Sequence, residues 1–330
     1  MKALICKQLG HPLATDDKKP LKLVQNHPQP SPSLPANGVR IRVTAAALNF
    51  SDALQIQGLY QDRPKLPFVP GSEVSGVVIE VGRDVRTVQV GDAVCAVMRG
   101  GGFAEEVVVR DGAALKLPAG TDVAAAAGLP LAFGTSHVAL AERANLQPGQ
   151  TVLVLGAAGG VGIAAVQIAK VMGARVVAVC RGSAKAAALR ALGADAVVDT
   201  AAAGKDVPLR QLIKAAAPQG IDVVYDPVGG VAFMESLKTI NWGAQILIIG
   251  FASGTIPKIS SNIALVKNAT LHGVFWGSYM QHRPRVLRQS LEQLLAWLGE
   301  GRISIPIFHR RALFALASSA PLVASKPYWP

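Results

Sequence analysis

The order of apolar and polar positions divides the chain into two regions. From residue 1 to about residue 128, short apolar or alternating runs, such as 39–45, 76–81 and 93–97, lie between Gly and Pro turns. This spacing predicts a compact β-rich domain. From Thr151 onward, apolar strands alternate with segments of helical length. That pattern predicts a parallel, doubly wound sheet, so the expected fold class is α/β.

The second region can be divided into individual elements by its periodicity. The expected strands cover residues 151–155, 175–179, 196–198, 222–225, 245–249 and 270–275, and the expected helices cover 161–172, 183–192, 209–216 and 231–240. Leucine spacing predicts a further helix over 285–298. An alanine-rich stretch over 123–144 predicts one or two helices that lead into this region, interrupted near Pro130.

A glycine cluster follows the first strand of the second region. Ala157, Gly159 and Gly162 occupy the positions of the dinucleotide fingerprint G-x-G-x-x-G, with Ala in place of the first glycine. In this reading Ala157 makes the tight turn, Gly159 admits a pyrophosphate, and Gly162 lets the helix pack on the strand. The free N–H groups of the helix start favour phosphate. The cluster therefore predicts a dinucleotide site rather than packing alone.

The end of the second strand of this region distinguishes the two nicotinamide cofactors. An acid there would accept hydrogen bonds from a ribose 2′-hydroxyl, whereas a cation would meet a 2′-phosphate. This chain has Arg181, Ser183 and Lys185, with no acid at the strand tip. We expect NADPH, with a guanidinium fork and an ammonium on the phosphate. The alternative is that these are ordinary solvated residues at a helix start.

Composition narrows the class of protein. The chain has 330 residues, is 50% hydrophobic and only 16% charged, which is typical of a folded enzyme-like protein. No apolar run is long enough to span a bilayer. The first residues begin directly as an alternating strand, without the features of a leader. We expect a cytoplasmic protein, and an organelle is not excluded.

Charge and metal-binding residue types add little further chemistry. The net charge of +12 would suit nucleic acid, but the basic residues are spread thinly and are not interleaved with aromatics. Nucleic acid and membrane are therefore not expected partners. Three separate cysteines indicate small buried apolar residues, and the histidines form no metal-like pair. No Ser-His-Asp relation can be read from the sequence, which argues against a hydrolase.

Several motifs carry a family resemblance over about residues 1 to 305. They are 48–52, Leu-Asn-Phe-Ser-Asp; 58–60, Gly-Leu-Tyr; 70–76, Pro-Gly-Ser-Glu-Val-Ser-Gly; 131–135; 157–162; 226–230; and 250–254. The chain resembles the zinc-independent quinone oxidoreductase, or ζ-crystallin-like, branch of the medium-chain dehydrogenase/reductase superfamily. Residues 262–279 are also similar to its subgroup called quinone oxidoreductase-like protein 2, notably the plant members.

The resemblance implies a fold and a domain organisation. A GroES-like β-rich catalytic domain would cover 1–128, and a doubly wound Rossmann NADPH-binding domain would cover 129–276. The chain would then return to the catalytic domain over 277–330. Residues 308–330 lack the usual terminal helix and strand of the family, so we expect this atypical tail to be poorly packed.

The resemblance also makes zinc testable in the sequence. Zinc alcohol dehydrogenases of this superfamily carry a Cys where this chain has Asn49, and a His where it has Ser72. Amide and hydroxyl side chains do not replace thiolate and imidazole as zinc ligands. The four-cysteine structural zinc lobe is missing as well. We therefore expect no metal.

Without a Lewis acid, an enzyme of this kind suits acceptors that already tolerate hydride, such as quinones or α,β-unsaturated carbonyls. By analogy, Asn49 and Tyr60 would lie beside the nicotinamide. Tyr60 would either donate its O–H to the acceptor or form a pocket wall, and Asp52 would orient the loop. The family pattern assigns these further cofactor contacts: Thr135, Ala158, Gly159, Gly160, Val161, Gly162, Gly182, Thr200, Gly250, Phe251, Val274 and Phe275.

The leading hypothesis is an NADPH-dependent, zinc-free quinone reductase that acts in a cleft between its domains. A 2-alkenal or enone reductase would use the same site. A weakly catalytic NADPH sensor or RNA-binding protein is the alternative from another class. A homodimer is expected by family analogy, through the edge strand near 270–275.

Overall fold

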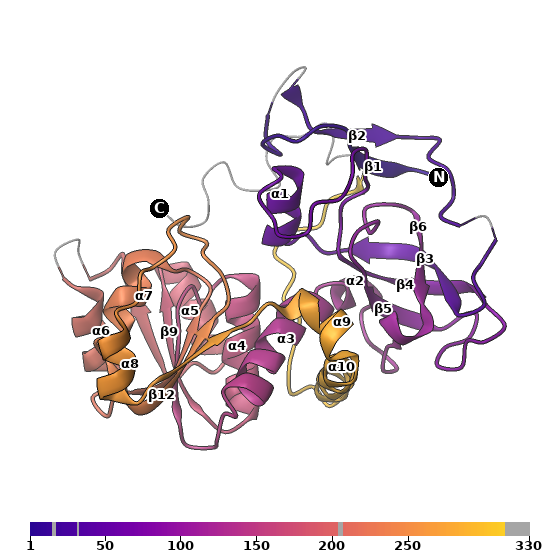
Figure 1. The fold of residues 1–330 in the computed structure, drawn as a ribbon. Helices are drawn as coiled ribbons and strands as arrows, with labels where there is room; N and C mark the ends of the chain where they lie inside the picture. Colours follow the sequence, from indigo (N-terminus) through magenta and orange to yellow (C-terminus); the bar gives the residue numbers. More distant parts are fainter. Residues whose placement is uncertain (15–17, 32, 204–206, 314–330) are drawn as a thin grey trace. The chain divides into compact units, whose positions relative to one another are not determined.

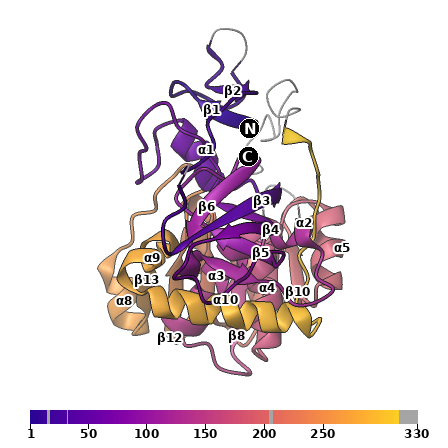
Figure 2. The ribbon, with the colours of Figure 1, turned by 90° about the vertical axis from the view of Figure 1, so that its right-hand side faces the viewer.

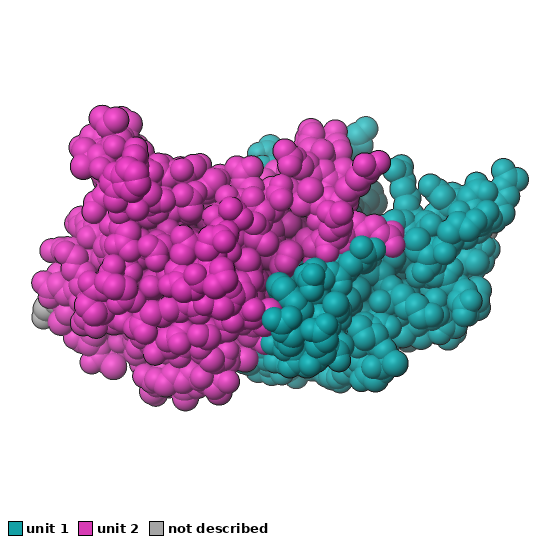
Figure 3. All heavy atoms as spheres, turned by 90° about the horizontal axis from the view of Figure 1, so that it is seen from below, with its two compact units in different colours: residues 1–131, 291–328 teal, residues 132–290, 329–330 magenta. Residues whose placement is uncertain are grey.

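The computed structural model describes residues 1–14, 18–31, 33–203 and 207–313. Within these residues the chain forms two compact units, shown in Figure 3. Unit 1 comprises residues 1–131 and the segment that begins at Leu291, and unit 2 comprises residues 132–290. No helix among the described residues is both long and apolar enough to cross a bilayer.

Unit 1 is built on a five-stranded antiparallel sheet with the strand order β6-β3-β4-β5-β7. Its strands are β3 (Gly38–Ala46), β4 (Glu73–Val81), β5 (Ala93–Val97), β6 (Glu106–Arg110) and β7 (Ala114–Lys116). A separate pair, β1 (Ala3–Cys6) and β2 (Leu21–Val24), precedes it. Every second residue of these strands, such as Val39 and Ile41, is buried in one core. The predicted β-rich domain is confirmed.

Unit 1 also contains three short helical segments, each of which comes directly after a strand of the sheet in the chain. They are α1 (Phe50–Ile56), α2 (Val123–Ala126) and the 3₁₀ turn η2 (Asp111–Ala113). The sequence pattern predicted no helix at 50–56. Only seven residues long, α1 is too short to show a helical period, and it is fixed by polar contacts at its start.

Unit 2 contains a six-stranded parallel sheet with the strand order β10-β9-β8-β11-β12-β13. Its strands are β8 (Thr151–Val154), β9 (Arg175–Cys180), β10 (Ala196–Asp199), β11 (Ile221–Asp226), β12 (Ile240–Ile248) and β13 (Thr270–Gly273). Its helical segments are α3 (Pro130–His137), the π-helix η3 (Val138–Arg143), α4 (Gly160–Val171), α5 (Ser183–Ala191), α6 (Leu209–Ala216), α7 (Gly230–Ser236), α8 (Ser261–Lys267), the 3₁₀ turn η4 (Trp276–Ser278) and α9 (Tyr279–His282). The first two residues of α3 belong to unit 1. The predicted doubly wound α/β sheet is confirmed.

Helices cover both faces of this sheet. Figure 1 shows α6, α7 and α8 on one side and α3 and α4 on the other, and Figure 2 gives the view at right angles. Alternate strand residues such as Leu153 and Val177 pack with Ile213 of α6 and Phe233 of α7. Their neighbours along the strands, such as Val152, are equally buried. Burial on both faces is why these strands are continuous apolar runs.

Two boundaries in unit 2 differ from the prediction. Helix α7 ends at Ser236 instead of continuing to residue 240, because Thr239 donates its hydroxyl to the Ser236 carbonyl at 2.7 Å and closes the last turn. Strand β12 then begins at Ile240, earlier than expected. Helix α8 was not predicted; its apolar residues Leu265 and Val266 are 79% and 72% exposed in the structure.

The second crossing between units lies after Ser290, later than the predicted 276/277 boundary, because residues 276–290 pack on unit 2. Trp276 packs closely on Gly134 of α3, since a Cβ added to this glycine would lie only 2.8 Å from the indole ring. Arg283 forms an ion pair with Glu142 at 3.1 Å. Helix α10 (Pro284–Gly299) therefore begins in unit 2 and continues into unit 1.

The start of the atypical tail is described as far as residue 313. Arg310 forms an ion pair at 2.7 Å with Asp122, the residue that caps α2. The expectation of a poorly packed tail concerns mainly residues 314–330, which lie outside the described part of the chain. All three cysteines are free and buried, as expected.

Candidate active site

Four polar side chains of unit 1 form a hydrogen-bonded group, which we call the acid–amide cluster: Asn49, Asp52, Ser72 and Glu73. The Asn49 backbone N–H donates to Asp52 Oδ2 at 2.8 Å, and the Asn49 side-chain amide donates to Glu73 Oε1 at 2.7 Å. The Ser72 hydroxyl donates to Asp52 Oδ1 at 3.2 Å. Asn49 thus joins two carboxyl groups that are far apart in the chain.

Both carboxyl groups of the cluster are buried. Glu73 is 1% exposed and Asp52 is 0% exposed. Burial raises the pKa of Glu73 to about 8, although hydrogen bonds from Asn49 and Leu131 oppose it. Burial likewise raises the pKa of Asp52 to about 6. The charge of Asp52 raises the pKa of Glu73 further, so the cluster holds a proton near neutral pH.

Secondary structure explains where the cluster forms. Asp52 lies in the first turn of α1, where its carboxylate accepts an N–H that has no partner within the helix. Glu73 begins β4, and its Oε2 accepts the Leu131 N–H in the first turn of α3 at 2.7 Å. Glu73 therefore ties the two helix starts to the sheet.

Tyr60 belongs to the same neighbourhood. It is partly buried, and its pKa is raised first by burial and then by the charges of Asp52 and Asp62. A raised pKa means that the phenol keeps its proton and remains a hydrogen-bond donor at neutral pH. The three residues predicted as catalytic, Asn49, Asp52 and Tyr60, are thus brought together in unit 1.

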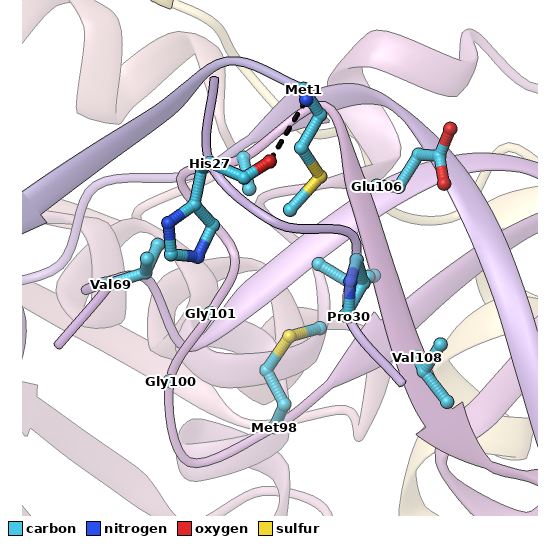
Figure 4. Close-up of a pocket in the computed structure, with 11 residues that line it drawn as sticks. Met1, His27, Pro30, Val69, Met98, Gly100, Gly101, Glu106 and Val108 are labelled. Atoms are coloured by element: carbon cyan, nitrogen blue, oxygen red, sulfur yellow. Dashed lines mark hydrogen bonds between the residues drawn. The ribbon is translucent and has the colours of Figure 1, made fainter. Parts of the chain in front are cut away.

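A separate pocket of about 140 Å³ lies elsewhere in unit 1 (Figure 4). The terminal amine of Met1 donates to the His27 carbonyl at 3.0 Å beside it. Its lining residues are Met1, His27, Pro30, Val69, Met98, Gly100, Gly101, Ala104, Glu106, Val107 and Val108. None of these is a predicted site residue, and the volume is below the ~300 Å³ typical of small-molecule sites.

The glycine cluster of unit 2 connects β8 to α4. The positive φ of 57° that the tight turn requires falls on Gly156 and not on Ala157, which corrects the assignment made from the sequence. Ala157 instead donates its N–H to Val179 of the neighbouring strand. A Cβ on Gly162 would lie 2.7 Å from the Ala157 Cα, so only glycine permits this packing of helix on turn.

The loop fits a pyrophosphate. Ala158, Gly159 and Val161 are partly exposed and Gly160 is exposed, so their backbone is accessible. Gly159 precedes α4 and has no side chain to cap it. The first N–H groups of a twelve-residue helix are therefore available to an anion, and the helix dipole favours one there.

The neighbouring strand ends bring the predicted ribose contacts together. Arg181 and Ser183 are exposed, Gly182 has a φ of 106°, and Lys185 lies in the first turn of α5. Thr200 donates its hydroxyl to the Cys180 carbonyl at 3.2 Å. The sequence did not point to Asp199, which ends β10 and accepts the Gly182 N–H at 2.7 Å.

The predicted nicotinamide contacts follow β12 and β13, and Asp226 at the end of the neighbouring β11 holds the adjoining loop. Burial raises the pKa of Asp226 to about 6, while the N–H groups of Val228 and Gly229 donate to its carboxyl at 2.8 and 2.9 Å. The Gly250 N–H donates to the Asp226 carbonyl at 3.3 Å. Gly250 and Phe251 are partly exposed, Phe275 is exposed, and Val274 is buried. Thr135 is buried in α3.

Metal binding needs a different set of donors. Asn49 and Ser72 use their side chains to donate hydrogen bonds to carboxylates. Among the residues that the structure describes, no group of three or more His, Cys, Asp or Glu side chains is placed to hold a metal ion.

Comparison with known proteins identifies the family to which the chain belongs. Residues 35–119 match the alcohol dehydrogenase GroES-like domain, and residues 160–298 match the family described as zinc-binding dehydrogenase. The chain is 39% identical over 307 residues to a quinone oxidoreductase-like protein 2 homolog of Nematostella vectensis, which covers 92% of this chain and 80% of the relative. The chain belongs to the quinone oxidoreductase branch of the medium-chain dehydrogenase/reductase superfamily.

Other members of this branch support the assignment. Quinone oxidoreductase-like protein 2 of Bos taurus is 36% identical over 303 residues, with 92% of this chain and 83% of the relative covered. The Thermus thermophilus quinone oxidoreductase, solved also with NADPH, has a TM-score of 0.72 at 36% identity and covers 91% of this chain and 88% of its own. A Pseudomonas syringae quinone oxidoreductase has a TM-score of 0.84 at 28% identity, with coverages of 96% and 94%. The predicted branch and fold are confirmed.

Besides Asp199, two site residues were not singled out from the sequence. Glu73 lies inside the motif 70–76, and its signal was its place directly after Ser72, where zinc enzymes have Gly-His-Glu. Asp226 opens the motif 226–230, but its role as an acceptor for the following loop depends on side-chain geometry. A pattern of residue types does not contain that geometry.

The buried Glu73 predicts how stability depends on pH. Its folded pKa of about 8 lies above the ~4.3 of a free Glu, so the folded state binds this proton more tightly than the unfolded state. The free energy of unfolding should therefore fall by a few kcal/mol between pH 5 and pH 8. Urea unfolding across this range should give a shallower decline for Glu73→Gln, with Asp52 supplying the remainder.

Glu105→Gln is the matched control, since the Glu105 side chain is 47% exposed. Its pH dependence should follow that of the unmodified protein. Parallel curves for the unmodified protein and Glu73→Gln would contradict the assignment.

Proposed function

We propose that this protein is an NADPH-dependent, zinc-free oxidoreductase that transfers hydride to quinones or similar activated carbonyl acceptors. The observation that carries this proposal is the acid–amide cluster. At the two positions where zinc enzymes of the superfamily have Cys and His, this chain has Asn49 and Ser72, and both donate to buried carboxyl groups. A donor set of this kind offers no thiolate or imidazole for zinc.

The proposed cofactor contacts come from unit 2. The accessible backbone of Ala158–Val161 at the start of α4 would hold the pyrophosphate, and Arg181, Ser183 and Lys185 would hold the 2′-phosphate. Gly182 and Thr200 would lie near the adenosine ribose and adenine. Thr135, Gly250, Phe251, Val274 and Phe275 would line the nicotinamide half. Relatives solved with NADPH support this assignment.

The proposed chemistry depends on the absence of zinc ligands at Asn49 and Ser72 and on the hydrogen-bond donors that the chain supplies. The reduced nicotinamide, when bound, supplies the hydride. Without a Lewis acid, the acceptor must itself spread the incoming charge onto an oxygen, as quinones and enones do. The protein then has to hold the acceptor and donate hydrogen bonds to the developing oxyanion.

Tyr60 is the donor that we assign to this oxyanion. Burial, and then the charges of Asp52 and Asp62, raise the pKa of Tyr60 above its usual range, so the phenol is a protonated hydrogen-bond donor at neutral pH. Asn49 is held by Asp52 and Glu73 in one orientation. The role that we assign to Asp52 is to position the start of α1.

Cofactor preference is the first test. Purified protein should oxidise NADPH with a panel of quinones, and NADH more slowly. Arg181→Ala should lower kcat/KM for NADPH by about tenfold through loss of the charged pair with the phosphate and leave NADH unchanged. Arg285→Ala, an exposed arginine of α10, is the control and should change neither.

The outcomes of this test separate the alternatives. Faster turnover of 2-alkenals than of quinones would assign an alkenal reductase with the same site. Nucleotide binding without turnover of any acceptor would contradict the oxidoreductase proposal and favour the sensor. RNA binding by this basic chain, lost steeply as salt is raised, would point to the nucleic-acid alternative.

The role of Tyr60 predicts a selective loss of rate. Tyr60→Phe removes one hydrogen bond to the oxyanion, so kcat should fall about tenfold to a hundredfold with little change in the KM for NADPH. Stopped-flow measurement of nicotinamide absorbance gives the rate. Tyr279→Phe, a partly buried tyrosine of α9, serves as the control. An unchanged kcat in Tyr60→Phe would leave Tyr60 as a wall of the site only.

A homodimer is the proposed assembly. Strand β13 is one edge of the six-stranded sheet, and its outer side can pair with the same strand of a second copy across a two-fold axis. Sedimentation should give twice the chain mass of 34.3 kDa. Leu265→Lys, on the helix before β13, should weaken the dimer, whereas Val231→Lys on α7, equally exposed at 79%, should not. A monomer at micromolar concentration would refute the assembly.

A further inference from the structure

Strand β10 ends on an acid beside the turn between β9 and α5. Asp199 is the last residue of β10 and lies in register with Cys180 of β9. Its Oδ1 accepts the Gly182 N–H at 2.7 Å and the Ala201 N–H at 2.9 Å. Gly182 is the residue between Arg181 and Ser183. A carboxylate is therefore fixed directly against the turn that carries two of the proposed 2′-phosphate contacts.

This carboxylate is charged at neutral pH. Hydrogen bonds from the backbone of Gly182, Ala201 and Ala202 hold the pKa of Asp199 below its usual range, and Arg190 adds to the effect. Burial raises the pKa of the Cys180 thiol; the charge of Asp199 adds to this effect, and the charges of Lys185 and Arg190 of α5 oppose it. The turn therefore combines cations with one fixed anion.

We propose that Asp199 is a specificity-determining residue that limits the preference of this protein for NADPH over NADH. The inference rests on the proposed function. Asp199 accepts the N–H of Gly182, between Arg181 and Ser183, so its negative charge would repel a 2′-phosphate held by these two side chains. A ribose 2′-hydroxyl carries no charge and is not repelled. Asp199 thus weakens NADPH binding and leaves NADH binding nearly intact. It therefore reduces the difference between the affinities for the two nucleotides.

The geometry allows the charge to be removed without removing the turn. Asn has one side-chain oxygen, which can still accept the Gly182 and Ala201 N–H groups. Asp199→Asn therefore deletes the negative charge and keeps an acceptor for these two of its three N–H partners. Asp195→Asn is a matched control because Asp195 immediately precedes β10, accepts the Val176 N–H at 2.7 Å and pairs with Lys170 at 2.8 Å. It changes the net charge equally at the other end of the strand.

Binding measurements test the inference without turnover. Fluorescence titration should give a dissociation constant for NADPH that is about three- to tenfold lower in Asp199→Asn, with that for NADH unchanged within twofold. The gain should shrink as salt is raised, because the effect is electrostatic. Asp195→Asn should match the unmodified protein for both nucleotides.

Three results would overturn the inference. Equal changes for NADPH and NADH would mean that Asp199 only shapes the turn, and a change in Asp195→Asn equal to that in Asp199→Asn would mean that net charge alone acts. A normal preference for NADPH that does not respond to Asp199→Asn would refute this inference and leave the proposed function standing. Failure of the unmodified protein to bind either nucleotide would instead refute the proposed function.

Discussion

The buried carboxyl group of Glu73 is the interaction on which the candidate site of unit 1 depends. It joins β4 to the side-chain amide of Asn49 before α1, and to the Leu131 N–H at the start of α3. Removal of a carboxyl group from water costs several kcal/mol, and the two N–H donors offset part of that cost. Each polar side chain of the acid–amide cluster is hydrogen-bonded to another member, and these bonds stabilise the cluster in its buried position.

In unit 2, carboxylates at the carboxyl ends of strands likewise accept hydrogen bonds from backbone N–H groups. Asp226 accepts two N–H groups of the loop after β11, and Asp199 accepts one N–H from the turn after β9 and one from the residues after β10. These carboxylates fix backbone loops, and the loops present accessible N–H groups where phosphates are expected. In both units the protein supplies rigid positions and hydrogen bonds, while the proposed nicotinamide supplies the hydride.

The parts of the structure that depend on periodicity were predictable from the sequence. The strands of the parallel sheet are apolar on both faces, so β8 to β11 stood out, and α6 fell on the predicted residues. The parts that depend on side-chain contacts were not. Helix α1 is fixed by Asn49 and Asp52, the tight turn lies at Gly156, and Asp199 is distant in sequence from the turn that it holds. These features need the three-dimensional register of separate elements.

The central claim is that hydride transfer in this protein needs no metal. The most direct test is to measure the zinc content of the purified protein together with its rate of NADPH oxidation by a quinone, before and after exhaustive chelation. The account predicts full turnover in protein that contains no stoichiometric zinc, because Asn49 and Ser72 occupy the ligand positions. Turnover that rises in proportion to bound zinc, or that chelation abolishes and zinc restores, would contradict it.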